Sequence, residues 1–153
     1  MLDSLPYELP ELVTSAPLDT HRSTVLPEWV DWNGHMNVAF YVTAFDQASG
    51  AFMRNMGLGR RYVDGKLGMT FVLEAHITYD REMREGAPMR FTTQLLERDA
   101  KKVHLYQEMF HAEQGYLRCH QRGDRDEHRL HDAPLRLLAR SRSRAAGNAV
   151  AGP

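Results

Sequence analysis

The clearest hydrophobic pattern in the chain runs from Val38 to Met56. Apolar residues recur there every three or four positions, at Val38, Tyr41, Phe45, Ala48, Phe52 and Met56, and this spacing is typical of one buried helix face. Asn33 or Asn37 could cap the start of the helix, and Gly57 is well placed to end it. The pattern therefore predicts one long amphipathic helix.

Other parts of the chain alternate between apolar and polar residues, as strands do. Residues 21–26 form a first short run, which Pro27 ends. Three longer runs follow the helix at residues 71–79, 89–95 and 103–110, separated by polar turns. The alternation predicts long antiparallel strands with one face on a core, and the fold class is therefore α+β.

These patterns are absent at both ends of the chain. Residues 1–19 contain three prolines and are interpreted as an irregular lead-in. Residues 118–153 contain eight arginines and no Ile, Phe, Met, Tyr or Trp, so they can bury little apolar surface to offset the entropy of ordering. We therefore expect a domain over residues 20–117 whose last strand is missing or disrupted, followed by an arginine-rich, disordered tail.

Two explanations suit this unusual C-terminal segment. One is a genuine disordered tail. The other is a frameshift, because one permitted codon choice for residues 117–136, moved by a single base, encodes an alternating strand and a polar turn. A frameshifted protein would have unpaired strand edges and lower stability than its relatives, and sequencing the gene would distinguish the two explanations.

Composition narrows the class of protein. The formal net charge of −1 gives no reason to expect nucleic acid or an anionic membrane as a partner. The single cysteine, Cys119, excludes an internal disulfide and suits a reducing cytosol. The N-terminus lacks the features of a signal peptide, and no apolar run approaches the roughly 20 residues that span a bilayer. A cytoplasmic protein is expected.

Candidate chemistry is concentrated immediately before the predicted helix, at Asp31, Gly34, His35 and Asn37. Backbone N–H groups at a helix start are unpaired and favour negative charge. Asp31 could act as a nucleophile or general base, while amides near Gly34 and His35 could polarise a carbonyl. Structural roles are also open: Asp31 as a turn residue, His35 bonded to a loop carbonyl, and Asn37 as a cap.

The order of strand, D-x-x-G-H-M-N motif, long helix and antiparallel strands resembles the hot-dog thioesterase family, in its 4-hydroxybenzoyl-CoA thioesterase branch. The resemblance covers about residues 20–117. Its matching residues are Asp31, Gly34, His35, Asn37, Tyr41 and the run Glu74-Ala75-His76-Ile77. That run, together with Leu26-Pro27-Glu28-Trp29-Val30-Asp31, is most similar to the betainyl-CoA thioesterases associated with carnitine breakdown.

The resemblance implies a five-stranded antiparallel sheet around one helix, in a homodimer or homotetramer with active sites at the subunit interface. It also implies hydrolysis of a small acyl-CoA thioester, with Asp31 as the catalytic carboxylate. Glu74 and His76 could meet Asp31 across that interface, although cross-strand pairing explains them equally. Arg60 and Arg61 could hold the phosphates of coenzyme A, although such loop charges are commonly only solvated.

No cofactor is expected, because the spacings of His35, His76 and His104 match no standard zinc pattern. Two other classes of function remain alternatives. One is a non-catalytic acyl-CoA-binding module, or the inactive product of a damaged gene. The other is a hot-dog enoyl-CoA hydratase, which would need a downstream D-x-x-x-x-H run that this chain lacks in a suitable place.

Overall fold

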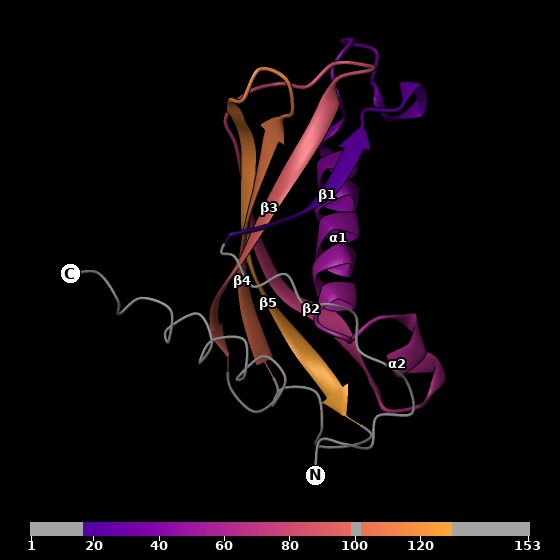
Figure 1. The fold of residues 1–153 in the computed structure, drawn as a ribbon. Coiled ribbons are helices and arrows are strands. Elements are labelled where there is room, and N and C mark those ends of the chain that lie inside the picture. Colours follow the sequence, from indigo (N-terminus) through magenta and orange to yellow (C-terminus); the bar gives the residue numbers. More distant parts are fainter. Residues whose placement is uncertain (1–16, 99–101, 130–153) are drawn as a thin grey trace, which may run out of the picture.

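A five-stranded antiparallel sheet curves along one long helix, α1 (Val38–Asn55), in the computed structural model, which describes residues 17–98 and 102–129 (Figure 1). The strands lie in the order β1-β3-β4-β5-β2. Their bounds are β1 Leu18–Thr24, β2 Gly68–Tyr79, β3 Pro88–Arg98, β4 Lys102–His111 and β5 Leu117–Arg129. The predicted α+β class and hot-dog arrangement are confirmed.

The helix forms where the apolar spacing predicts it. Asn37 is the cap, since its side-chain oxygen accepts a hydrogen bond of 3.0 Å from the amide of Ala39. The buried face of α1 packs into two neighbouring clusters of apolar side chains. The first includes Tyr41, Phe45, Met89, Phe91 and Met109, and the second includes Phe52, Met53, Tyr62, Val103 and Leu105.

Strand β2 lies at an edge of the sheet, and its apolar side chains are less covered than the alternating pattern suggests. Phe71, Leu73 and Tyr79 are 40%, 44% and 46% exposed, respectively. The pairing with β5 is interrupted by a bulge between Val72 and Glu74. The edge of β2 that faces away from β5 pairs with no other described strand.

The predicted absence of a last strand is wrong for residues 118–129. Strand β5 is a central strand, paired with β4 on one side and β2 on the other. Main-chain hydrogen bonds make this strand possible without a strong apolar pattern. Among its described side chains, Cys119 is fully buried and Gln121 nearly so, so small and polar groups complete this part of the interior.

The finding removes the structural argument for a frameshift, because the sheet has no missing strand to restore. The tail prediction for residues 130–153 and the lead-in prediction for residues 1–16 lie outside the described residues.

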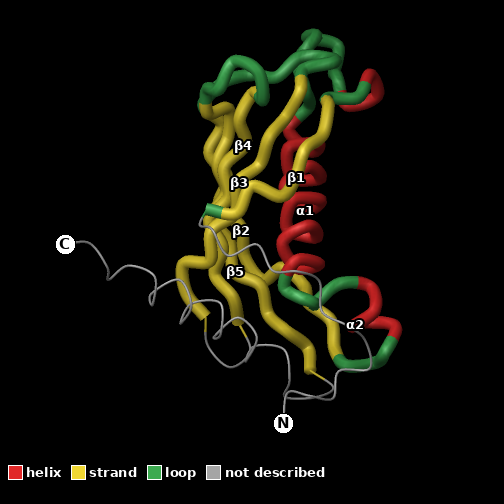
Figure 2. Tube along the Cα trace, in the orientation of Figure 1, coloured by secondary structure: helices red, strands yellow, loops and turns green. Residues whose placement is uncertain are grey.

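Three loops gather at the end of the sheet where α1 begins (Figure 2). The first loop precedes α1, the second follows β2, and the third connects β4 to β5. Two of them are joined directly, since the amide of Met36 donates to the carbonyl of Met83 at 2.8 Å.

The short 3₁₀ helix η1 (Pro27–Trp29) lies in the first loop. The short helix α2 (Arg60–Asp64) lies at the opposite end of α1 (Figure 1). No helix in residues 17–98 and 102–129 is long and apolar enough to span a membrane.

Candidate active site

The D-x-x-G-H motif folds into a tight turn before α1. The carbonyl of Asp31 accepts from the amide of Gly34 at 2.9 Å, and the amide of Asp31 donates to the carbonyl of His35 at 2.9 Å. Gly34 has a φ of +79°, a conformation that glycine adopts without the steric cost of a Cβ. The turn holds the Asp31 carboxylate next to the start of the helix.

The Asp31 carboxylate is anchored by one oxygen only. Its Oδ1 accepts a hydrogen bond of 2.8 Å from the amide of Asn33, as in an Asx turn. Oδ2 makes no hydrogen bond to any residue that the structure describes. One oxygen therefore orients the carboxylate, while the other is available to a water molecule or substrate.

Of the two amides proposed as oxyanion donors, only one is available. The Gly34 amide is already bonded to the carbonyl of Asp31. The amide of His35 has no acceptor within residues 17–98 and 102–129, and those of Met36 and Asn37 donate to the carbonyls of Met83 and Trp29. Both amides lie in the turn before α1, and its geometry leaves that of His35 without an acceptor among the described residues.

The side chain of His35 is held by a residue that the sequence did not indicate. Its Nε2 lies 3.1 Å from Oε2 of Glu82, in the loop after β2. Glu82 also contacts Arg84 at 3.3 Å. Glu82 is one of several charged residues between β2 and β3, and no local spacing connects it to His35. Only the packing of the two loops brings them together.

Tyr41, expected in the core, is buried and braces the same loop. Its phenol oxygen accepts from the amide of Met83 at 3.0 Å, and its ring meets that of Tyr79 edge to face. Burial raises the pKa of Tyr41 above its ordinary value, an effect that the hydrogen bond from Met83 partly offsets. The phenol therefore stays protonated near neutral pH and acts as a structural group.

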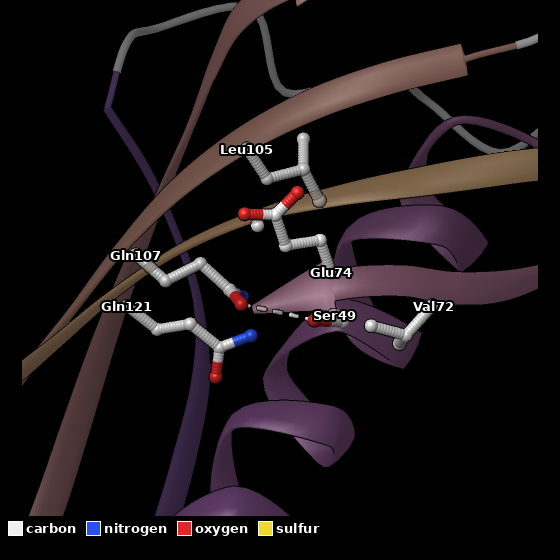
Figure 3. Close-up of a pocket in the computed structure, with 7 residues that line it drawn as sticks. Ser49, Val72, Glu74, Leu105, Gln107 and Gln121 are labelled. Atoms are coloured by element: carbon white, nitrogen blue, oxygen red, sulfur yellow. Dashed lines mark hydrogen bonds between the residues drawn. The ribbon is translucent and has the colours of Figure 1, made fainter. Parts of the chain in front are cut away.

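Glu74 does not lie beside Asp31 in this chain. Together with Ser49, Gln107 and Gln121, it lines a small polar pocket between the middle of α1 and the sheet (Figure 3). The pocket has room for about one water molecule, with a volume of about 10 Å³. Ser49 lies 12 residues after Asn37, the cap of α1. Glu74, which lies next to Ser49, is therefore separated from the turn before α1.

A buried polar network accompanies this pocket and was not predicted. Ser49 Oγ lies 2.9 Å from Gln107 Oε1, and Gln107 Nε2 donates to Thr93 at 3.0 Å. Gln121 Oε1 is buried without a hydrogen-bond partner in the described part of the chain. Ser49 of α1 and Gln107 of β4 occupy core-facing positions of their elements, where apolar residues are expected. The hydrophobic pattern therefore did not indicate a polar interior.

The remaining candidates belong to β2 and α2. His76 is exposed on β2, opposite Arg122 of β5 in the strand register. Arg60 and Arg61 belong to α2, where Arg60 pairs with Asp64 at 3.3 Å. The 18 residues of α1, about 27 Å at 1.5 Å per residue, separate α2 from Asp31. One chain by itself therefore does not bring Arg60 and Arg61 together with Asp31.

The chain is similar to known thioesterases in sequence. The model of the thioesterase-like superfamily matches residues 25–125. The betainyl-CoA thioesterase of Pseudomonas aeruginosa is 40% identical over 96 residues, which cover 63% of this chain and 60% of that protein. The L-carnitine dehydrogenase/betainyl-CoA thioesterase of Ruegeria pomeroyi is 34% identical over 111 residues, which cover 71% of this chain and 23% of that protein. The chain thus matches less than two thirds of the length of either relative.

Solved structures share the fold. A Pseudomonas putida KT2440 protein, described as a candidate thioesterase, superposes with a TM-score of 0.69 at 29% identity, covering 91% of this chain and 93% of that one. The 1,4-dihydroxy-2-naphthoyl-CoA thioesterase of Synechocystis has the same TM-score at 14% identity, covering 80% and 93%, and supports the fold alone. Since the family model spans well over half of the sequence, the chain belongs to the thioesterase-like superfamily, which has the hot-dog fold.

Proposed function

We propose that this chain hydrolyses the thioester bond of an acyl-CoA and that Asp31 is the catalytic carboxylate. The observation that carries the proposal is the turn before α1. One Asp31 oxygen is anchored there by the Asn33 amide at 2.8 Å, and the other faces no partner among the described residues. The neighbouring His35 amide also lacks an acceptor in that part of the chain. A carboxylate beside an unpaired donor suits attack on a carbonyl.

Two chemical routes use the same groups. As a general base, Asp31 would take a proton from water while the water oxygen attacks the carbonyl carbon. As a nucleophile, Asp31 would itself attack, release the CoA thiolate, and leave an acyl–aspartyl anhydride that water hydrolyses. In both routes the His35 amide would stabilise the negative carbonyl oxygen. The products are the free acid and CoA, and we leave both routes open.

A betainyl group is the acyl group we favour, with a role in carnitine breakdown. The names of the Pseudomonas aeruginosa and Ruegeria pomeroyi relatives support it. So does Trp32, which follows Asp31 and is 96% exposed. A betainyl group carries a quaternary ammonium, and indole rings attract such cations through their π face. Trp32 would then contribute to selection of the acyl group.

We also propose a homodimer formed through the edge of β2, which we expect to act in the cytoplasm. This edge has no neighbouring strand in the described chain, and exposed edges with apolar side chains favour strand pairing. Antiparallel pairing of two β2 strands would bring α2 of one copy toward the loop after β2 of the other. Arg60 and Arg61 could then approach the substrate from the second copy. Dimers could pair further into tetramers.

The function is tested by thiol release from a panel of acyl-CoA thioesters, betainyl-CoA included. We expect Asp31→Asn to reduce kcat at least about 100-fold, because the loss of a general acid–base group typically costs 10²–10⁴-fold. Glu97→Gln is the matched control, since it removes an exposed carboxylate on β3 and should leave kcat unchanged. Hydrolysis that Asp31→Asn does not affect would refute the assignment.

The same panel separates the alternatives. Binding of acyl-CoA without thiol release would indicate a non-catalytic module or an inactive gene product. Hydration of an enoyl-CoA without thiol release would indicate the hydratase. A preference for neutral acyl groups over betainyl-CoA would refute the acyl assignment and leave the thioesterase assignment intact.

A further inference from the structure

A second, larger cavity lies beside the turn of Asp31. It is formed where the loop after β2 meets the connection between β4 and β5, at the end of the molecule where the loops gather (Figure 2). Its volume is about 230 Å³, room for several water molecules. The polar residues that line it are Glu82, Arg84, His111, Gln114 and Arg118.

Glu82 lines this cavity and also contacts the turn of Asp31. The carboxylate of Glu82 contacts the His35 ring at 3.1 Å. The main-chain carbonyl of Glu82 accepts a hydrogen bond of 3.0 Å from Nη1 of Arg118. Glu82 therefore lies between the turn of Asp31 and this cavity.

Positive charge exceeds negative charge in the cavity lining. Arg84 and Arg118 contribute two cations, and Glu82 is the only carboxylate among the lining residues. A third cation lies close by, because Arg81 and Arg118 both lie against the ring of Tyr116, at 4.9 and 5.5 Å from its centre. An anion is therefore the class of ligand that this cavity suits.

The arginines retain hydrogen-bond donors that the described residues do not satisfy. Nη1 and Nη2 of Arg118 are bonded to Glu82 and Gln114, but its Nε is buried and has no partner in the described part of the chain. Arg84 donates to Glu82 through Nη2 at 3.3 Å, and the rest of its side chain is exposed. A guanidinium held by two hydrogen bonds, beside an exposed one, matches the several acceptor oxygens of a phosphate.

We propose that this cavity is a phosphate-binding site, formed by Arg84 and Arg118, that holds a phosphate group of the CoA substrate. This inference depends on the proposed function, because the CoA substrate would supply the phosphate. It also differs from the sequence prediction, which assigned phosphate binding to Arg60 and Arg61. Free phosphate has the same chemistry and would occupy the same arginines.

Calorimetric titration with CoA, pantetheine and inorganic phosphate tests the site without requiring catalysis. Pantetheine is the matched ligand, because it lacks every phosphate of CoA. We expect Arg84→Gln to weaken CoA binding at least about tenfold, as loss of a charge-assisted hydrogen bond would, and to leave pantetheine binding unchanged. Arg84→Glu, which reverses the charge, should weaken CoA binding further.

Arg22→Gln is the matched protein control, since Arg22 is also exposed and paired with one carboxylate, Asp19, but lies on β1 at the far edge of the sheet. It should bind CoA as the wild type does. An effect of Arg84→Gln on phosphate but not on CoA would support the site and assign it to free phosphate. Equal CoA and phosphate binding in the wild type and both Arg84 variants would overturn it, as would an equal loss in Arg22→Gln.

The two proposals fail in different ways. Loss of thiol release with retained, Arg84-dependent CoA binding would refute the enzymatic function alone. Normal thiol release with Arg84-independent affinity for CoA and phosphate would refute the phosphate site alone.

Discussion

Two asparagines precede α1, and they differ in the atoms that make their hydrogen bonds. Asn37 uses its side chain to accept a hydrogen bond from the Ala39 amide. Asn33 uses its main-chain amide to anchor Asp31, so its own side chain is not required for that contact. Sequence position alone left both residues as possible caps.

Asn37→Ala should therefore lower the free energy of unfolding by about 1 kcal/mol, the usual cost of removing a helix cap. Urea unfolding followed by circular dichroism measures the change. Asn33→Ala is the matched control and should change stability by less than about 0.5 kcal/mol. A larger loss for Asn33→Ala than for Asn37→Ala would contradict the assignment of the cap.

Cys119 is fully buried on β5, and burial raises the pKa of its thiol to about 12. The thiolate is the reactive form of cysteine, so the folded protein should react slowly with iodoacetamide at pH 8. The reaction should become fast in denaturant, where the pKa returns to near its ordinary value. Mass spectrometry of the alkylated protein measures both rates, and rapid alkylation of the native protein would show that β5 is not packed as described.

At the scale of elements, β5 depends on a close approach between strands. A Cβ placed on Gly123 would lie 2.8 Å from the carbonyl oxygen of Glu74 on β2, which is closer than atoms normally approach. The carbonyl belongs to the backbone next to the β2 bulge, so it cannot rotate away as a flexible side chain could. Gly123 therefore permits the two strands to pair at this point.

Gly123→Ala should destabilise the protein by about 1–3 kcal/mol, as overpacking in an interior does. Gly50→Ala is the contrasting variant, because a Cβ on Gly50 of α1 would meet only the flexible end of Arg54, at 3.4 Å. It should stabilise the protein by about 0.5–1 kcal/mol through helix propensity. Thermal unfolding of the two variants measures both effects, and a stabilising Gly123→Ala would contradict the pairing of β5 with β2.

At the scale of the whole molecule, the outer edge of β2 has no neighbouring strand among the residues that the structure describes. Phe71, Leu73 and Tyr79 remain partly exposed on it, while the turn of Asp31, the loop after β2 and the cavity beside them lie at one end. An edge-to-edge dimer would cover these side chains and add a second copy of α2 near that end. Completion of the active site would then depend on assembly.

Leu73→Lys should shift the protein from dimer to monomer, because charge on an edge strand opposes pairing. Light scattering coupled to size-exclusion chromatography measures the molar mass. Leu26→Lys, which adds the same charge at a residue of similar exposure outside β2, is the matched control and should leave the mass unchanged. A monomeric wild type, or a dimer that Leu73→Lys does not disturb, would contradict the proposed interface.

Local periodicity was sufficient to predict α1 and strands β2 to β4, because each buries one face and the spacing of apolar residues records that burial. It also placed the candidate chemistry before α1, since a helix start leaves amides unpaired. It failed for β5, whose stability comes largely from main-chain bonds to two neighbours rather than from its own apolar side chains.

The sequence by itself thus determined the fold class, the family and Asp31 as the candidate catalytic residue. The tertiary structure decided that β5 completes the sheet and that Glu82 holds the His35 ring. It also decided that the His35 amide, rather than that of Gly34, lacks an acceptor among the described residues. It also separated Arg60 and Arg61 from Asp31 within one chain. Each of these results depends on contacts between residues distant in sequence, and side-chain periodicity, which reports only local burial, does not contain them.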